Sequence, residues 1–338
     1  MDTTVNVVQI IVPAHNAAQT IDACLQPLLG SSHLAPRVLV VDDGSTDDTA
    51  DRAERCGAAV LRLTGPLGPA AARNAGVAAT TAPVILFIDA DVVASPEAVE
   101  RIVTVFDRHP EAAAAFGSYD DRPPARNVVS LFKNLLHHFV HQQADERSAS
   151  FWAGFGAIRR EAFEAVGGFA ADRYRRPSIE DIELGARLWR AGRPVVVVRD
   201  AQVTHLKRWS LRQLVATDVR QRAYPWSELL VRGEAPGGDL NLRAGDRVAA
   251  IAAWMGLAGL VVALTGAWPV GATIAACALA TIVILNRRLY AGFARVGGWP
   301  FAIAAVALHA GYYLYSSATF GICLLRHAWR GRQIAGSR

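Results

Sequence analysis

Cysteine is scarce in this sequence, and the four that occur are far apart. They are Cys24, Cys56, Cys277 and Cys323, so no two form a Cys-x-x-Cys pair. Disulfide frameworks and zinc sites both need cysteines at short, paired spacings. The sequence therefore predicts neither, and we expect buried or free thiols in a reducing compartment.

Lysine is almost absent, and one long stretch has no acidic residue. Only Lys133 and Lys207 occur among 35 basic residues, and no Asp, Glu or Lys follows Arg247. Residues 248–338 hold seven arginines, a charge of +7, whereas the preceding residues hold 28 basic and 30 acidic side chains, a charge of −2. The net charge of +5 thus comes from the tail. A nucleic-acid-binding protein would carry basic residues over its main domain, so no nucleic-acid partner is expected.

Two glycine-rich nucleotide motifs are missing as well. Neither Gly-x-Gly-x-x-Gly nor Gly-x4-Gly-Lys-Ser/Thr occurs, which excludes the dinucleotide enzymes and P-loop proteins that those patterns mark. With 338 residues, 52% of them apolar, the chain is too apolar to be disordered. It is long enough for one large domain plus an appendage.

Short β-branched runs alternate with helical stretches over residues 5–118. This alternation predicts an α/β fold in which a mostly parallel, Rossmann-like sheet has helices on both faces and a ligand site at the carboxyl ends of its strands. The expected strands are 7–12, 38–41, 59–63, 84–88 and 113–116. The expected helices are 21–29, 46–56, 70–79 and 96–108. Beyond residue 120 the pattern is less regular, with strands expected at 150–158 and 194–198.

Acidic residues follow two of these strands. Asp89 and Asp91 come directly after the strand at 84–88, and two such carboxylates can share a divalent cation that bridges nucleotide phosphates. Acids also cap helices, so the pair alone is weak support. Asp43 follows the strand at 38–41 and could accept a hydrogen bond from a nucleobase N–H. Alternatively, this segment is an ordinary strand–turn–helix connection.

Six segments together resemble the family 2 glycosyltransferases in order and rough spacing. They are 11–16 (IVPAHN), 41–47 (VDDGSTD), 71–76 (AARNAG), 87–91 (FIDAD), 152–160 (WAGFGAIRR) and 178–184 (SIEDIEL). Enzymes of that family have the GT-A fold and invert the anomeric carbon of a nucleotide sugar. The resemblance covers residues 5 to about 210 and implies a role for each matching residue.

On the donor side, the resemblance implies that five residues bind the nucleotide sugar: Pro13, Asn16, Asp43, Arg73 and Asp89. Arg73 would lie near the phosphates, because a guanidinium suits oxygen anions. A divalent cation, Mn²⁺ or Mg²⁺, would be held by Asp91 with Asp89.

On the acceptor side, the resemblance implies that Asp181 takes the proton from the acceptor hydroxyl. Glu180 beside it would raise its pKa, because adjacent carboxylates repel. Both acids also suit a helix N-terminus, which is compatible with the catalytic role. Trp152 and Gly154 would line the acceptor side.

Segment 205–209 (HLKRW) departs from the family's processive polysaccharide synthases, which carry Gln-x-x-Arg-Trp. Those synthases also usually have more membrane spans, so the departure favours transfer of a single sugar. His205 is either a further metal ligand or a structural histidine. Lys207 and Arg208 could hold the leaving diphosphate, with Trp209 next to them. The histidines at 137, 138 and 141 indicate a solvated or acceptor-facing helix.

The C-terminal part of the sequence is predicted to be embedded in a membrane. Residues 248–265 and 270–285 flank a turn signal and are each near the lower length limit of a bilayer span, and 301–325 is a third candidate. The first two segments are expected to form a helical hairpin, and the positive-inside tendency puts both ends of this hairpin in the cytoplasm. Three spans would put the last arginines outside. The sequence leaves two and three spans open.

These observations predict a GT-A glycosyltransferase domain at 1–209, an amphipathic interfacial linker at 210–246, transmembrane helices at 247–326 and a basic tail at 327–338. The expected protein is a multi-pass cell-membrane enzyme with a cytoplasmic catalytic domain. It would transfer one sugar, from a UDP-sugar by preference, to a lipid-linked acceptor such as a polyprenyl phosphate or a glycolipid. Membrane lipids and a second copy of the chain are further expected partners. A nucleotidyltransferase and a catalytically silent membrane scaffold are the alternatives.

Overall fold

The computed structural model describes residues 8–235 and 244–336, with side chains up to residue 329. The expected first residue of the first strand, part of the predicted linker and the end of the basic tail lie outside this described part. The chain divides into two compact units. The first lies within residues 1–125 and 140–208, and the second within 126–139 and 209–338.

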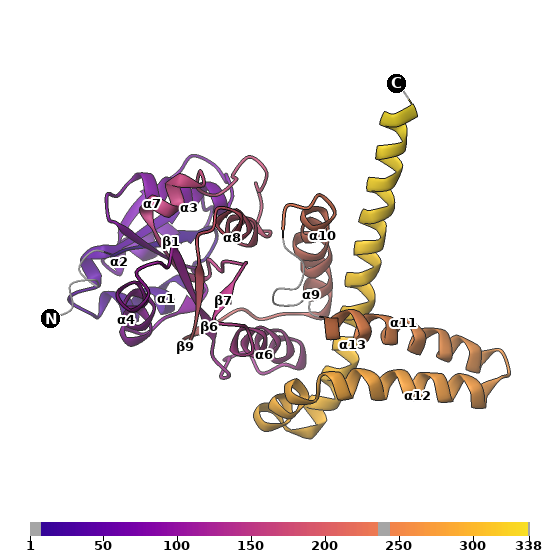
Figure 1. Ribbon diagram of the computed structural model, residues 1–338. Coiled ribbons are helices and arrows are strands. Elements are labelled where there is room, and N and C mark those ends of the chain that lie inside the picture. Colours follow the sequence, from indigo (N-terminus) through magenta and orange to yellow (C-terminus); the bar gives the residue numbers. More distant parts are fainter. Residues whose placement is uncertain (1–7, 236–243, 337–338) are drawn as a thin grey trace. The chain divides into compact units, whose positions relative to one another are not determined.

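The first unit is built on a nine-stranded sheet in the order β3-β2-β1-β4-β8-β6-β9-β5, with β7 paired to β9 (Figure 1). Strands β3, β2, β1 and β4 are parallel to one another, as the alternating pattern predicts. All five residues of β4 are buried, as expected for a strand covered on both faces. The strands are β1 Val8–Ala14, β2 Val38–Asp42, β3 Ala59–Arg62, β4 Val84–Ile88, β5 Val92–Val93, β6 Ala114–Tyr119, β7 Arg147–Ser148, β8 Phe155–Arg159 and β9 Val195–His205.

Strand β8 lies antiparallel between β4 and β6, which makes the sheet mixed. Gly156 pairs with Phe87, and a side chain at this glycine would meet the carbonyl of Trp152 at 2.3 Å. The expected strand at 150–158 begins only at Phe155, and the one expected at 194–198 continues to His205. The α/β fold class is confirmed, but residue patterns do not reveal strand direction, because side chains alternate in the same way in either.

Helices of the first unit cover the sheet. They are α1 Ile21–Leu29, α2 Thr49–Arg55, α3 Pro69–Ala78, α4 Pro96–Val103, α5 Val105–Arg108, α7 Arg160–Ala165 and α8 Glu180–Arg190. Helix α4 begins where expected, because Pro96 occupies its first turn and the Ser95 hydroxyl accepts a hydrogen bond from the Ala98 N–H. The single helix expected at 96–108 is instead divided at Thr104.

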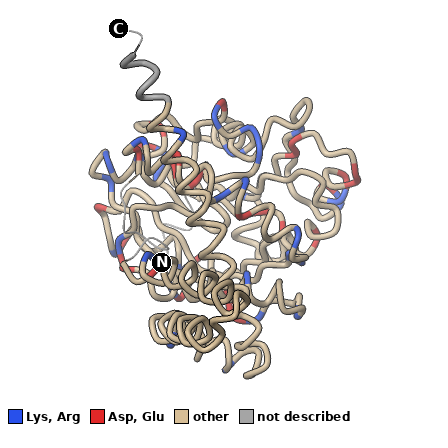
Figure 2. Tube along the Cα trace, turned by 90° about the vertical axis from the view of Figure 1, so that its right-hand side faces the viewer, with Lys and Arg blue, Asp and Glu red and all other residues tan. Residues whose placement is uncertain are grey.

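The second unit is helical. It contains most of α6 (Val128–Gln142), then α9 Leu211–Thr217, the π-helical turn η3 Asp218–Ala223, α10 Tyr224–Val231, α11 Ala244–Leu264, α12 Trp268–Leu285 and α13 Arg287–Gly336. Three of its described helices, at 244–264, 268–285 and 287–329, are long and apolar enough to cross a membrane. The charge pattern follows this division: Figure 2 shows basic and acidic residues spread over the first unit, whereas the coils at the bottom of the view are almost entirely uncharged.

Helices α11 and α12 form the predicted hairpin, and α13 is kinked. The hairpin helices approach closely at two glycines: a side chain at Gly271 would meet the backbone N of Ala263 at 2.3 Å, and one at Gly259 would meet the Gly271 carbonyl at 2.8 Å. In α13 the backbone of Gly298 has a φ of 81°, which ends one helical segment and starts another just before Pro300.

Candidate active site

The acidic residues singled out in the sequence follow adjacent strands. Asp43 comes directly after β2, and Asp89 and Asp91 come directly after β4, with β1 between those two strands. The carboxyl ends of parallel strands meet at one edge of a sheet, which is where α/β proteins bind ligands. The three carboxylates therefore share one edge of the first unit.

The loops after β1 and β2 are tied together by Asn16. Its backbone N–H donates to the Ser45 hydroxyl at 2.9 Å, and its side-chain oxygen accepts from the Thr46 N–H at 2.8 Å. Asn16 has a φ of 50°, a left-handed conformation that asparagine tolerates better than most residues. Pro13 is buried in β1 opposite Val41. Both residues thus shape this loop pair, and contact with a nucleotide remains a prediction.

Asp43 orients the loop before α3. Its two buried carboxylate oxygens accept hydrogen bonds from the backbone N–H groups of Leu67, at 2.8 Å, and Gly68, at 2.7 Å. Each oxygen keeps a further lone pair, so the predicted bond from a nucleobase N–H is compatible with these two. The sequence did not indicate this loop, whose Gly68 has a φ of 98° and no room for a side chain.

Arg73, on α3, connects the donor-side acids to helix α8. Its guanidinium donates to Asp89 Oδ1 at 2.7 Å and to Glu180 Oε1 at 2.9 Å, and it lies over the Phe169 ring at 5.4 Å. Arg73 is almost fully buried, but the two carboxylates outweigh desolvation and raise its pKa, so it stays charged. Burial raises the pKa of Asp89, and Arg73 opposes that shift.

Asp181 lies in the first turn of α8. Its Oδ1 accepts from the Ile182 N–H at 2.8 Å and its Oδ2 from the Ala153 N–H at 3.2 Å. Burial, followed by the charge of Glu180, raises its pKa to about 6 despite those bonds and the nearby Arg73. A carboxylate with such a pKa is matched to proton transfer near neutral pH.

Glu180 is differently placed. Its buried carboxylate accepts from Arg73 and, through Oε2, from the Ser178 N–H at 2.9 Å. It therefore holds Arg73 and the start of α8 in place, and it supplies the charge that raises the pKa of Asp181.

Asp91 and His205 come together because β5 pairs with the end of β9. Val92 lies opposite His205 in that antiparallel pair, and this brings Asp91 Oδ2 to 3.4 Å from His205 Nε2. Burial opposes ionisation of Asp91, but the contact with His205 and the charge of Lys207 lower its pKa overall. The carboxylate is therefore ionised at neutral pH and able to bind a cation.

Aromatic side chains lie next to Asp91 and His205, and the sequence indicated only some of them. The His205 ring stacks on Tyr119 with centroids 4.6 Å apart, and Tyr119 meets Trp152 edge-on at 4.7 Å. His141 lies 5.1 Å from Trp152 and is buried, so of the two expected alternatives the solvated one does not apply to it and the acceptor-facing one stays a prediction. Tyr119 could have been suspected, because it ends β6, a neighbour of the site strands.

The remaining predicted acceptor-side residues fall into two places. The Gly154 carbonyl accepts from the Asp89 N–H at 3.1 Å, and a side chain at Gly154 would meet the Trp152 ring at 2.6 Å. Lys207 and Arg208 are exposed just after β9. Trp209 belongs to the second unit, where its backbone N–H donates to the Ser130 hydroxyl at 2.7 Å.

The side chains of Asp91 and His205 suit a divalent cation that takes its remaining ligands from the substrate and from water. Within the described residues, no group of three or more His, Cys, Asp and Glu side chains is placed to hold a metal. Asp91 and His205 offer a carboxylate oxygen and an imidazole nitrogen, which suit Mn²⁺. Ions such as Mg²⁺ often use one or two protein carboxylates plus substrate phosphates and water.

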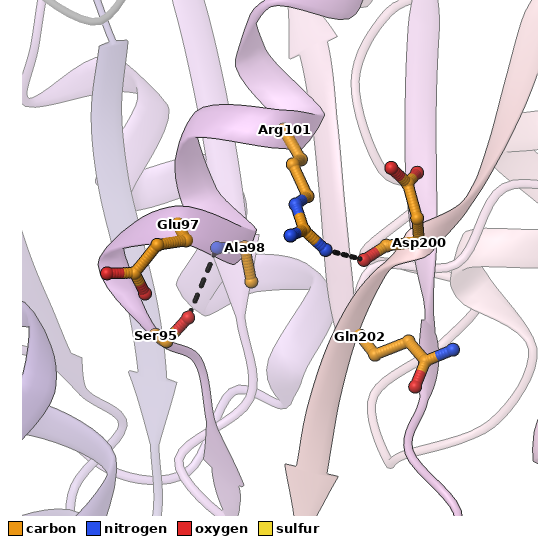
Figure 3. Close-up of a pocket in the computed structure, with 6 residues that line it drawn as sticks. All are labelled: Ser95, Glu97, Ala98, Arg101, Asp200 and Gln202. Carbon is orange, nitrogen blue, oxygen red and sulfur yellow. Dashed lines mark hydrogen bonds between the residues drawn. The ribbon is translucent and has the colours of Figure 1, made fainter.

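A separate open depression of about 440 Å³ lies between α4 and β9 (Figure 3). Arg101 there donates to the carbonyl of Asp200 at 2.8 Å, and Ser95 caps α4. None of the predicted site residues lines it. Its lining residues are Ser95, Glu97, Ala98, Arg101, Asp200 and Gln202.

Comparison with known proteins gives a family match over part of the chain. The model of the family described as Glycosyl transferase family 2 matches residues 9–167, the part that contains Asp43, Arg73, Asp89 and Asp91. Residues 9–167 are therefore similar to a family 2 glycosyltransferase domain, as predicted. The relatives described next are named as transferases of sugars, not of nucleotides.

Relatives of this chain are found in several bacteria. The validoxylamine A glucosyltransferase of Streptomyces hygroscopicus subsp. jinggangensis is 28% identical over 58% of this chain and 54% of its own length. The pre-mycofactocin glycosyltransferase of Mycobacterium tuberculosis is 29% identical over 89% of this chain and 67% of its own length. The chain spans about a third to two thirds of the curated relatives that it matches.

The fold of the chain also matches a solved structure. The mannosyltransferase PcManGT from Pyrobaculum calidifontis, in complex with GDP-Man and Mn²⁺, aligns with 96% of this chain and 87% of its own, with a TM-score of 0.54 and 18% identity. The GT-A fold class predicted from the sequence is therefore confirmed.

Proposed function

We propose that this glycosyltransferase moves a single sugar from a nucleotide sugar, with inversion, to an acceptor at the membrane. The observation that carries the proposal is the link through Arg73, which joins Asp89, on the donor side, to the turn of α8 that bears Asp181. One buried guanidinium thus fixes the donor-side acid and the candidate base relative to each other.

The donor would lie along the strand ends. Asp43 would accept the N–H of a uracil or guanine base, Arg73 would approach the phosphates, and Asp89 would contact the ribose. UDP-sugars are our first choice, and the GDP-Man bound by the structural neighbour makes GDP-mannose the next donor to test. Asp91 and His205, with Asp89, would hold Mn²⁺ or Mg²⁺. When bound, such a cation supplies positive charge to the departing diphosphate.

The acceptor would approach from the side of Trp152 and Gly154. Its oxygen forms a bond to the anomeric carbon on the face opposite the diphosphate, whose bond to that carbon breaks. The hydroxyl proton passes to an oxygen of Asp181, which two backbone N–H groups orient. Lys207 and Arg208, which are exposed just after β9, would attract the leaving diphosphate.

A lipid-linked acceptor is favoured by the second unit. Helices α11 and α12 are apolar along their length, so the enzyme would be held in the membrane and meet acceptors such as polyprenyl phosphates and glycolipids there. We propose a cell-membrane location with the catalytic unit in the cytoplasm, where nucleotide sugars are found.

The second candidate acceptor comes from the relatives. The Mycobacterium tuberculosis protein that aligns with 89% of this chain is named for glycosylation of pre-mycofactocin. An acceptor of that kind, presented at the membrane surface, is therefore the alternative to a lipid.

The test uses the full-length purified protein with UDP- and GDP-sugars, Mn²⁺ or Mg²⁺, and one acceptor at a time: polyprenyl phosphate, a glycolipid, pre-mycofactocin or none. We expect release of a nucleoside diphosphate that one lipid acceptor stimulates, and a product with the inverted anomeric configuration by NMR. Stimulation by pre-mycofactocin alone would select the second candidate. Release of pyrophosphate, or no release above that of the Asp91→Asn variant, would contradict the proposed function.

A further inference from the structure

The α11–α12 hairpin has no polar face. Its side chains are buried where the two helices touch each other and where they meet α13, whereas large apolar residues such as Ile251, Leu260, Val270 and Ile284 are all more than half exposed. A helix that is apolar all round belongs in hydrocarbon. Helices of 21 and 18 residues are about 32 and 27 Å long, close to the ~30 Å core of a bilayer.

Helix α13 has a different character. From Trp299 to Trp329 it runs for about 46 Å, half as long again as a bilayer core. One face carries buried polar residues, His309 and Thr319 among them. The other face exposes apolar residues, including Ile303 and Leu325, and both terminal tryptophans are exposed. Tryptophan is enriched at the membrane–water interface.

The middle of α13 touches both ends of the hairpin. The Tyr313 hydroxyl is 3.3 Å from Asp246 Oδ1, in the first turn of α11, and 3.2 Å from Asn286 Oδ1, just after α12. Because two consecutive spans begin and end on the same side of a bilayer, Tyr313 lies at that surface. Figure 1 shows the later part of α13 running across the base of the hairpin rather than alongside it.

Charged residues surround the same part of α13. The Tyr315 hydroxyl donates to Asp218 Oδ2 at 2.7 Å, and the buried Lys133 Nζ donates to Asp218 Oδ1 at 2.5 Å. If residues 299–329 crossed the bilayer, Tyr315 would lie at its centre and this ion pair would lie in hydrocarbon, where charges are costly. At the depth of the lipid headgroups the pair is tolerated.

We propose that α11 and α12 are the membrane spans of the described chain, and that residues 299–329 of α13 lie in the plane of the membrane surface with their apolar face in the lipid. Arg247, Arg287, Arg288, Arg295 and Arg326 then share one side, which the positive-inside tendency makes the cytoplasmic side. Three spans would instead divide these arginines between two sides.

This inference rests on the membrane attachment in the proposed function and not on the sugar chemistry. Sidedness is tested in intact cells with a membrane-impermeant maleimide and the full-length protein. The background is Cys56→Ser with Cys277→Ser, since Cys24 and Cys323 are buried. Three single variants are compared: Ala267→Cys, Arg288→Cys and His327→Cys.

We expect labelling from outside only at position 267, and labelling at 288 and 327 only after permeabilisation. External labelling at 327 would mean that α13 crosses the bilayer. No external labelling at 267 would mean that the hairpin does not cross. Either result overturns the proposal.

Depth is tested separately with single nitroxides introduced by Ile303→Cys, Leu314→Cys and Leu325→Cys, in vesicles of neutral and anionic phospholipid. We expect three equal, shallow depths. A much deeper label at 314 would indicate a span, and three labels out of contact with lipid would place α13 in water, so both outcomes contradict the proposal. These readouts need no turnover, so failure of sugar transfer leaves them interpretable.

Discussion

Replacing Asp181 by asparagine separates the two chemical types of acceptor. A hydroxyl acceptor must lose its proton as it attacks, and a positioned base contributes typically ~10²–10⁴-fold to such a step. Asp181→Asn should therefore lower kcat by that factor with a hydroxyl acceptor, a loss of about 2.7–5.4 kcal/mol of transition-state stabilisation. The KM for the donor should change little, because the proposed role of Asp181 is to act on the acceptor and not on the nucleotide.

With a phosphate acceptor, we expect Asp181→Asn to cause a smaller loss of kcat. The phosphate is already an anion and needs no base, so the substitution affects only the geometry around residue 181. The carboxylate accepts from two backbone N–H groups, of Ala153 and Ile182, whereas an amide has one oxygen and must leave one of them unpaired. One lost hydrogen bond is worth about 0.5–1.5 kcal/mol, or roughly tenfold or less in rate. A loss above 100-fold thus indicates a hydroxyl, and a loss near tenfold indicates a phosphate.

The pH profile gives an independent check on the same residue. The pKa of Asp181 is raised to about 6, and a base acts only when deprotonated. The rate with a hydroxyl acceptor should be flat above pH 7 and fall tenfold per unit below about pH 6, and this acid limb should vanish in Asp181→Asn. A phosphate acceptor titrates near pH 6 itself, so its limb should persist in the variant.

The assay is nucleoside diphosphate release at saturating donor, with each acceptor and with water alone. Asp172→Asn is the matched control, because Asp172 is an exposed acid in the loop before α8. If Asp181→Asn transfers to a hydroxyl acceptor and hydrolyses the donor at wild-type rates, Asp181 is only a residue of the helix N-terminus and its assignment as base is wrong.

Three further substitutions test the rest of the site. Asp91→Asn should abolish metal-stimulated transfer while leaving the circular dichroism spectrum unchanged; full activity in the presence of a chelator would refute the metal role. Arg73→Met removes the guanidinium partner of the buried Glu180 and of the partly exposed Asp89, which should cost about 3–5 kcal/mol of stability and appear as a lower melting temperature in detergent; an unchanged temperature would contradict the role of this link. Gly154→Ala places a methyl group 2.6 Å from the indole ring of Trp152 and should cost about 1–3 kcal/mol, measured as lost stability or lost kcat/KM. The control Gly245→Ala, whose methyl group would meet open space, should cost nothing.

The sequence by itself determined the local features of this protein. Alternating strand and helix patterns placed β1, β2 and β4 within two residues of their observed ends, because buried parallel strands need continuous apolar runs. It also placed Asp43, Asp89 and Asp91 at strand ends, and it identified the hairpin from two uncharged runs with a turn between them. Each of these features depends on neighbours in the chain, which a sequence displays directly.

Only the tertiary structure decided what depends on residues far apart in the chain. Arg73 meets Glu180 across 107 residues, and Asp91 meets His205 only because β5 pairs with the end of β9. The stacking of Tyr119 on His205 and the antiparallel insertion of β8 arise in the same way. The two-or-three-span question also stayed open at sequence level. Hydropathy measures only whether a helix is apolar enough to cross a bilayer, whereas the contacts of Tyr313 and Tyr315 locate the middle of α13 among polar and charged partners.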